Sequence, residues 1–278
     1  MPLLDADVDI RVSEEAGRFL VAKRDLPGDY PFLEELPFVR WASLAGLQDD
    51  DDRTVEEEKA LLTLPELEAE WPDLAWNSWK QWQLDHSPRA AVNILSLAAS
   101  LCKVASTFFK YLEAFAECES EEERIRLALE HALRPFDRLC ALPAGSEVEF
   151  QNASTDEKIA QLKVGIGVGD DDNDSKLRKP FAGLPVAVLD VLLDPVTIGA
   201  LAGRLTQNAL SYSPPRNGVF VLLSLCNHEC DPSVGVKALE AEDGGEPRIE
   251  LRTRRAVRAG EALTISYCPE DLSLVERR

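Results

Sequence analysis

The chain has 278 residues, of which 50 are Asp or Glu and 30 are Lys or Arg, so its formal charge is −20. This excess of acid argues against nucleic-acid binding, because neutralising phosphates requires clustered Lys and Arg. It favours basic partners such as Lys-rich peptides, although solubility alone explains an acidic surface equally well. Apolar residues make up 45% of the chain, which is enough for one large core or two smaller ones.

Cysteine usage and apolar segments indicate the compartment. The six cysteines form no Cys-x-x-Cys pair, so we expect reduced thiols in a cytoplasmic or nuclear protein. The first ten residues lack a basic segment followed by an apolar one, and we expect no signal peptide. The most apolar stretch, residues 184–203, is interrupted by Asp190, Asp194 and Pro195, so we expect no membrane association through a spanning segment.

The first 41 residues have the pattern of β structure. Apolar and polar residues alternate over 8–12, and a short apolar run over 18–22 predicts a second strand. The sequence Leu-Pro-Gly-Asp at 26–29 predicts a turn, and a further strand-like run covers residues 31–41.

The pattern changes to helical from residue 54 to about 140. Apolar spacing predicts a helix within 90–117, and Ser120 followed by Glu123 predicts the N-terminal cap of another. We expect that second helix to end near residue 133. Residues 151–180 are rich in Gly and Asp, which predicts a loop, and Asp194-Pro195 predicts the start of a helix ending near 205.

The C-terminal segment is predicted to be β again. Residues 219–225 form a continuous apolar run, which is typical of a buried strand, and 262–267 form the last predicted strand. Residues 234–239 and 248–253 flank Asp243-Gly244-Gly245, a hairpin signal. The order β, helical, β indicates an α+β protein in which one β domain is interrupted by a helical lobe.

Three apparent motifs have simpler explanations. Residues 165–170 resemble a dinucleotide fingerprint only superficially, because an acid in sixth place would repel a pyrophosphate. Residues 170–174 begin like a calcium loop that lacks the required Gly and Glu. Trp76, Trp79 and Trp82 share a helix face, for which core packing is the preferred interpretation and partner docking the alternative.

The clearest motifs lie near the C-terminus. Residues 227–233 read Asn-His-Glu-Cys-Asp-Pro-Ser, and residues 260–267 read Gly-Glu-Ala-Leu-Thr-Ile-Ser-Tyr. They resemble the two signature motifs of SET-domain protein methyltransferases, Asn-His-Ser-Cys-x-Pro-Asn and Gly-Glu-Glu-Leu-Thr-x-x-Tyr. Residues 17–28 resemble the family's opening strand pair, and Asn-Ala-Leu at 208–210 resembles its Asn-x-Phe element. The closing residues 276–278 resemble the SMYD-type subgroup.

This resemblance implies a fold and a division of the chain. We expect an α+β protein with a SET-type β fold of short strands, split by a large and mostly helical insert. Residues 1–41 and 194–278 would form the two parts of the SET domain, and residues 42–193 the acidic insert. The insert stands where SMYD-type proteins carry a MYND zinc finger, but it lacks the Cys and His of such a finger.

The resemblance also implies a reaction, the transfer of a methyl group from S-adenosyl-L-methionine to a lysine of a basic protein, with histones among the candidates. The free lysine amine has a pKa of about 10.4 and must lose its proton, which a desolvated channel beside a sulfonium favours. Tyr267 would be the catalytic hydroxyl. Asn227, His228, Arg18 and Asn208 would bind the cofactor, Asn227 by its amide and His228 by its backbone. The alternative is a catalytically weak or inactive SET scaffold that binds partners through its acidic insert.

The sequence departs from the family pattern at Phe19, which replaces a Gly, at Glu229, which replaces a Ser, and at Ser233, which replaces an Asn. In the family a Cys-x-Cys-x-x-Cys segment follows and joins the cysteine of the first motif, here Cys230, at zinc. The sequence ends at Arg278 without that segment, and we assign no metal ligand.

Overall fold

The computed structural model describes residues 7–14, 16–42, 88–139, 160, 162–163, 166, 180–213, 216–240 and 247–268. The predictions for the tryptophans of the insert, for the two glycine- and aspartate-rich motifs, for the hairpin turn and for the last three residues lie outside them, apart from Ile166, which is helical and buried. The chain forms two compact units, Met1–Phe38 with Val219–Arg278, and Val39–Gly218. The boundaries predicted from the sequence, at 41/42 and 193/194, separate the two parts of the expected domain from its insert. They do not describe compact units, so they stay a prediction.

The first strand pair follows the predicted alternation. β1 (Val8–Ser13) pairs antiparallel with β2 (Gly17–Ala22), with Val8 opposite Ala22 and Ser13 opposite Gly17. Only one end of this hairpin is covered, because Val8 and residues 20–22 are buried whereas Val12 is 74% exposed. The pattern therefore identifies the strand, but half of its apolar face lies in solvent.

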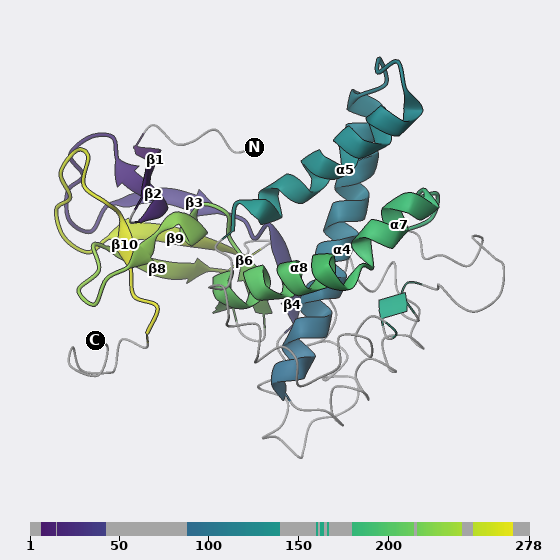
Figure 1. Ribbon diagram of the computed structural model, residues 1–278. Coiled ribbons are helices and arrows are strands. Elements are labelled where there is room, and N and C mark those ends of the chain that lie inside the picture. Colours follow the sequence, from purple (N-terminus) through teal and green to yellow (C-terminus); the bar gives the residue numbers. More distant parts are fainter. Residues whose placement is uncertain are drawn as a thin grey trace. The chain divides into compact units, whose positions relative to one another are not determined.

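A three-stranded antiparallel sheet forms the centre of the first unit, in the order β3 (Pro31–Glu35), β9 (Arg248–Thr253), β8 (Val234–Leu239) (Figure 1). β8 and β9 confirm the two predicted hairpin arms, and Ile249 and Leu251 are fully buried. Glu250 lies between them in the sequence, on the face that strand alternation turns away from the core, but it is only 8% exposed. Its carboxylate binds Nε of Arg252 at 3.0 Å, which offsets the cost of that burial.

The single strand predicted over 31–41 is wrong, because the segment forms two strands in different sheets. β3 ends at Glu35, and β4 (Val39–Ala42) joins β6 (Arg216–Val219) and β5 (Ala209–Ser213) in the order β4-β6-β5. Pro37 lies between them and has no N–H to continue a ladder, which explains the break.

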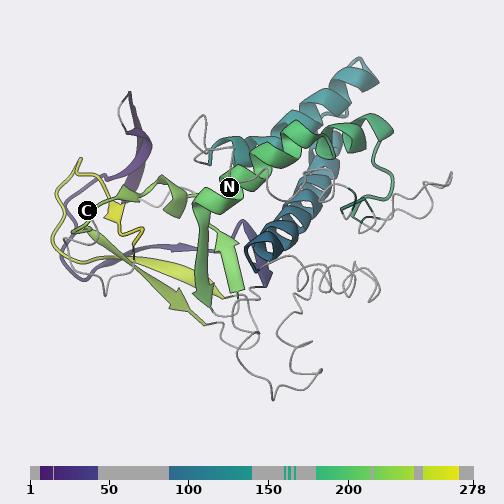
Figure 2. The ribbon, with the colours of Figure 1, turned by 60° about the horizontal axis from the view of Figure 1, so that its bottom comes forward.

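Four helices are described in the second unit: α4 (Pro88–Ala114), α5 (Glu121–Asp137), α7 (Val186–Leu192) and α8 (Pro195–Asn208). The apolar spacing in α4 is confirmed, since Leu97, Leu101, Val104 and Phe108 are fully buried. α4 packs against α5 and α8, and β5 follows α8 without a loop (Figures 1 and 2). No single described helix is long and apolar enough to cross a membrane, and only the pair α7 and α8, bent by 52°, reaches that length and composition together.

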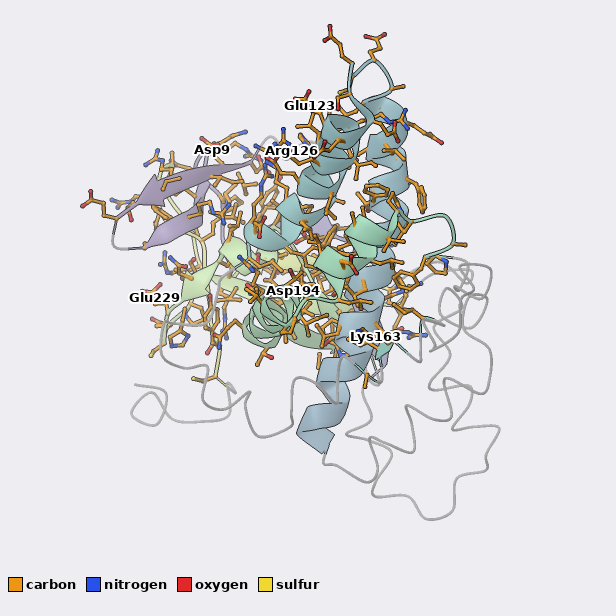
Figure 3. The ribbon with its side chains drawn as sticks, turned by 45° about the vertical axis from the view of Figure 1, so that its right-hand side comes forward. Asp9, Glu123, Arg126, Lys163, Asp194 and Glu229 are labelled. Carbon is orange, nitrogen blue, oxygen red and sulfur yellow. The ribbon has the colours of Figure 1, made fainter. Side chains whose placement is uncertain are left out.

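The two predicted helix starts are confirmed. Oγ of Ser120 accepts a hydrogen bond from the Glu123 amide at 3.4 Å, and α5 then runs four residues beyond its predicted end, to Asp137. The carboxylate of Asp194 accepts bonds from the amides of Val196 (2.9 Å) and Thr197 (3.2 Å) at the start of α8, where Figure 3 labels it. These side chains satisfy amides that have no partner inside the helix.

Replacing Asp194 by Ala is expected to lower the free energy of unfolding by about 1 kcal/mol, because both capping bonds are lost. Urea denaturation followed by circular dichroism measures the change. Asp190→Ala is the matched control, since Asp190 is an exposed carboxylate inside α7 and caps no helix. Equal losses in the two variants would contradict a capping role for Asp194.

Candidate functional site

Two short strands bring the two C-terminal motifs together. β7 (Asn227–His228) pairs in parallel with β10 (Thr264–Ile265), with Thr264 opposite Asn227 and Ile265 opposite His228. The β8–β9 hairpin lies between them in sequence, and parallel neighbours require such a long connection. The strand predicted over residues 262–267 is thus only two residues long. The pairing brings Tyr267 next to Asn227 and His228.

Tyr267 is held at both its backbone and its hydroxyl. Its hydroxyl donates to the Cys226 carbonyl at 2.8 Å, and its backbone N–H donates to Nδ1 of His228 at 3.0 Å. The tyrosine and histidine ring centroids are 5.4 Å apart. The side chain is nevertheless 59% exposed. The phenol proton is therefore engaged by a carbonyl, while the oxygen lone pairs can accept a hydrogen from a ligand.

The ring of His228 has a defined tautomer. Because Nδ1 accepts the Tyr267 amide hydrogen, the neutral ring carries its own hydrogen on Nε2, which lies 3.5 Å from Sγ of Cys230. The sequence predicted that His228 contributes backbone groups to the cofactor. The structure adds a use for its ring, which holds the tyrosine backbone, and the cofactor role stays a prediction.

Asn227 lies against the β1–β2 turn. Its Nδ2 donates to the carbonyl of Ala16 at 3.4 Å, a long bond at an exposed place. Gly17, the next residue, has φ +63°, and no heavy atom lies within 4 Å of where a Cβ would stand. Arg18 follows and is exposed. An amide, an open stretch of backbone and a guanidinium fit a ligand that carries an amino-acid carboxylate and an ammonium, as S-adenosylmethionine does.

Asn208 belongs to the other compact unit, where it is the last residue of α8. Its Nδ2 donates to the carbonyl of Arg204 at 2.7 Å, so part of its amide satisfies the C-terminal turn of its own helix. Its predicted contact with the cofactor stays a prediction.

Two of the departures from the family pattern take part in a network that sequence reasoning missed. Oγ1 of Thr264 donates to the Glu229 carboxylate at 2.7 Å and accepts from the Ser233 amide at 3.1 Å. Oγ of Ser233 accepts from the Thr264 amide at 3.0 Å. Thr264 and Ser233 are buried. All three residues belong to the first unit, and Figure 3 labels Glu229. Thr264, the threonine of the second motif, was the residue from which the sequence could have predicted these hydrogen bonds between β10 and the first motif.

Residues 219–225 were predicted as a buried strand, and this is wrong. β6 ends at Val219, and the chain then turns through a short 3-10 helix, η3 (Leu223–Leu225). The run is mostly buried, as predicted, but its amides bond within the turn and to Glu35. A continuous apolar run does not distinguish a buried strand from a buried turn.

Burial changes the acidity of two groups beside this turn. Burial raises the pKa of the Cys226 thiol to about 12, and the nearby Glu35 charge adds to the effect. Burial also raises the pKa of Glu35, against the opposing influence of backbone N–H groups of residues 221–223. Cys226 is therefore a neutral thiol, and its part in the site is the carbonyl that binds Tyr267.

Within the described ranges, no group of three or more His, Cys, Asp and Glu side chains could hold a metal ion. Cys226, Cys230 and Cys268 form no disulfide with one another in this part of the chain. Sγ of Cys230 lies 3.5 Å from Nε2 of His228, so the described residues supply two neighbouring donor atoms at this place.

One protein family matches most of the chain, and some solved structures are similar to it. The SET domain family matches residues 17–268. No curated protein matches the sequence. Among solved structures, the crystal structure of the SET domain of LSMT bound to lysine and AdoHcy is similar, with 14% identity and a TM-score of 0.40. The match covers 96% of this chain and 50% of that one, so this chain spans about half the length of that structure.

The family match extends over nearly the whole chain and includes β2, β7 and β10, the strands that carry the candidate site. The predicted α+β fold of short strands with a helical segment inside the domain is confirmed. The chain therefore belongs to the SET domain family.

Proposed function

We propose that this chain is an S-adenosylmethionine-dependent protein-lysine N-methyltransferase, of a SMYD-like type without a recognisable MYND finger. Membership of the SET family supports a methyltransferase that uses this donor. The observation that carries the proposal is the parallel pairing of β7 with β10, because it places the Tyr267 ring beside the Asn-His pair.

When bound, S-adenosylmethionine supplies a methyl group on a positively charged sulfur. The Asn227 amide, the open backbone at Gly17 and the Arg18 guanidinium are the groups that would hold it. A guanidinium suits a carboxylate, and an amide offers both a donor and an acceptor.

Tyr267 would orient the nucleophile. Its hydroxyl hydrogen is bound to the Cys226 carbonyl, so the oxygen faces a substrate as an acceptor. An amine that donates one N–H to this oxygen has its lone pair turned to a defined direction, and the reaction depends mainly on such alignment. The two bonds to Tyr267 are made before substrate arrives, so little reorganisation is required during the reaction.

The proposed substrates are basic proteins, with histones as the first candidates. The formal charge of −20 attracts Lys-rich segments over several ångströms and raises their rate of encounter. The exposure of Tyr267 leaves it accessible to a lysine on another protein. A cytoplasmic or nuclear location, proposed from the cysteine usage, is compatible with such substrates.

Calorimetry with S-adenosylmethionine and the full chain tests the first requirement, and transfer of a labelled methyl group to core histones or to lysine-rich peptides tests the second. We expect binding together with a product whose mass increases by one or more methyl groups on lysine. Absence of cofactor binding would overturn the proposal. Partner capture without any methylated product would support the interaction scaffold, the alternative that the replaced residues Glu229 and Ser233 favour.

A further inference from the structure

One buried carboxylate of the first unit is not among the proposed cofactor or substrate contacts. Glu35 is the last residue of β3, where it pairs with Ile249 of β9, and only 7% of it is exposed. Oε1 accepts a hydrogen bond from the Leu222 amide at 2.8 Å, and Oε2 accepts one from the Leu223 amide at 3.0 Å. Glu35 therefore ties the end of a sheet strand to the turn that precedes Asn227.

Two further hydrogen bonds connect this turn with Tyr267. The carbonyl of Leu223 accepts the Cys226 amide hydrogen at 2.9 Å, and the Cys226 carbonyl accepts the Tyr267 hydroxyl at 2.8 Å. Three hydrogen bonds thus lead from the Glu35 carboxylate to the Tyr267 phenol. All of these residues belong to the first compact unit.

A carboxylate satisfies this turn better than other side chains would. The turn is apolar and buried, so its unpaired amides would cost free energy unless an acceptor reached them. Both oxygens of an ionised carboxylate are acceptors, and each meets one N–H. A carboxamide of the same shape has one oxygen, so its NH₂ group would face one of the two amides donor to donor.

We propose that Glu35 is a positioning residue for Tyr267, acting through the turn of residues 222–226. The proposal rests on the proposed function for its catalytic consequence, but the placement of the ring is a property of the protein alone. Asn227 and His228 have a separate support, the backbone pairing with β10 and the bond from the Glu229 amide to the Ile265 carbonyl at 3.0 Å. Loss of the carboxylate should therefore disturb the tyrosine more than the cofactor contacts.

Glu35→Gln is the test variant, and Glu250→Gln is the matched control. Both residues are buried carboxylates on strands of the same sheet, but Glu250 binds Arg252 and does not contact the turn. The chain has four tyrosines, so ring-labelled tyrosine gives a countable set of NMR signals, and Tyr267→Phe assigns one of them. We expect Glu35→Gln to shift the Tyr267 signal and to increase hydrogen exchange of residues 221–226, and Glu250→Gln to leave both unchanged.

The kinetic arm uses a double-mutant cycle. We expect Glu35→Gln to lower kcat about tenfold, with the Kd for S-adenosylmethionine changed less than about twofold, since misplaced groups lose rate more than binding. In the Tyr267→Phe background the same change should have no further effect on kcat, because the phenol through which Glu35 acts is absent. A role in stability alone would give equal losses in both backgrounds.

The outcomes separate the two proposals. A wild-type protein without methyl transfer overturns the proposed function, and the NMR and exchange measurements still decide the placement of Tyr267. An unchanged Tyr267 signal in folded Glu35→Gln overturns the positioning role, and so does an additive kinetic cycle. A Glu35→Asp variant covers the case in which Glu35→Gln does not fold, because it keeps the carboxylate but shortens its reach. Asp is expected to restore part of the lost rate, and a native Tyr267 signal with full activity would contradict the proposal.

Discussion

Tyr267→Phe is expected to lower kcat about 100- to 1000-fold, which is the usual cost of removing one group aligned with the reacting atoms. The substitution removes the hydroxyl together with its bond to the Cys226 carbonyl, whereas the backbone bond from residue 267 to Nδ1 of His228 and the strand pairing are unaffected. The hydroxyl is the atom that would accept an N–H from the substrate amine, and its loss leaves the amine without an oriented partner. Initial rates of methyl transfer at saturating cofactor measure the effect.

The control for this prediction is Tyr30→Phe, which removes a phenol oxygen from the same unit. Tyr30 bonds to the carboxylate of Asp7 and to the guanidinium of Arg24, and none of these groups contacts the candidate site. We expect the control to keep wild-type kcat and both variants to keep the wild-type affinity for S-adenosylmethionine. A rate in Tyr267→Phe within threefold of wild type, a margin of about 0.7 kcal/mol, would exclude Tyr267 from the chemistry.

The sequence predicts the motif residues of this site better than it predicts the residues that hold them in place. The two motifs at residues 227–233 and 260–267 are recognisable in the sequence, because they resemble family motifs and occur in the family's order. The structure brings Asn227, His228 and Tyr267 together through a strand pair of two residues each. Such short pairing has no periodic signal, because alternation needs four or more residues to be visible. The resemblance of the motifs, rather than any predicted strand, was what placed them together.

The support was missed because it depends on contacts between distant parts of the chain. Glu35 lies in a strand pattern beside Glu34, and nothing local distinguishes the buried acid from the one that pairs with Arg248 at the surface. The turn after Val219 was interpreted as a strand because its residues are apolar and buried. The burial of this turn was predicted correctly. The Leu222 amide, however, bonds to a carboxylate 187 residues away in the sequence, and a local sequence pattern cannot reveal so distant a partner.

The helices were predictable for the opposite reason, since their signals are local. Ser120 and Asp194 cap helices through amides two or three residues ahead, and the apolar residues of α4 recur with the period of one helix face. The β1 strand shows where local signals end. Its alternation marks a face correctly, yet Val12 on that face is exposed, because alternation does not say what covers a strand.

Asn227→Ala is expected to weaken binding of S-adenosylmethionine about 10- to 100-fold, because a side chain that offers both a donor and an acceptor is lost. The backbone of Asn227 stays in register with Thr264, so the tyrosine keeps its place and kcat at saturating cofactor should change much less than Kd. Calorimetry measures the first quantity, and methyl transfer at high cofactor concentration measures the second.

Asn227→Asp sharpens this prediction because it separates the two functions of the amide. The aspartate keeps an acceptor oxygen and has nearly the same shape, but it loses the N–H donors and the bond to the Ala16 carbonyl, and it adds a negative charge. If the Asn227 amide contacts the carboxylate of S-adenosylmethionine, the Asn227→Asp variant should bind this cofactor more weakly than Asn227→Ala does. If it meets the ammonium, Asp should bind more tightly than Ala. Asn217→Ala, a half-buried amide on β6, is the control, and an affinity for Asn227→Ala equal to that of this control would remove Asn227 from the cofactor site.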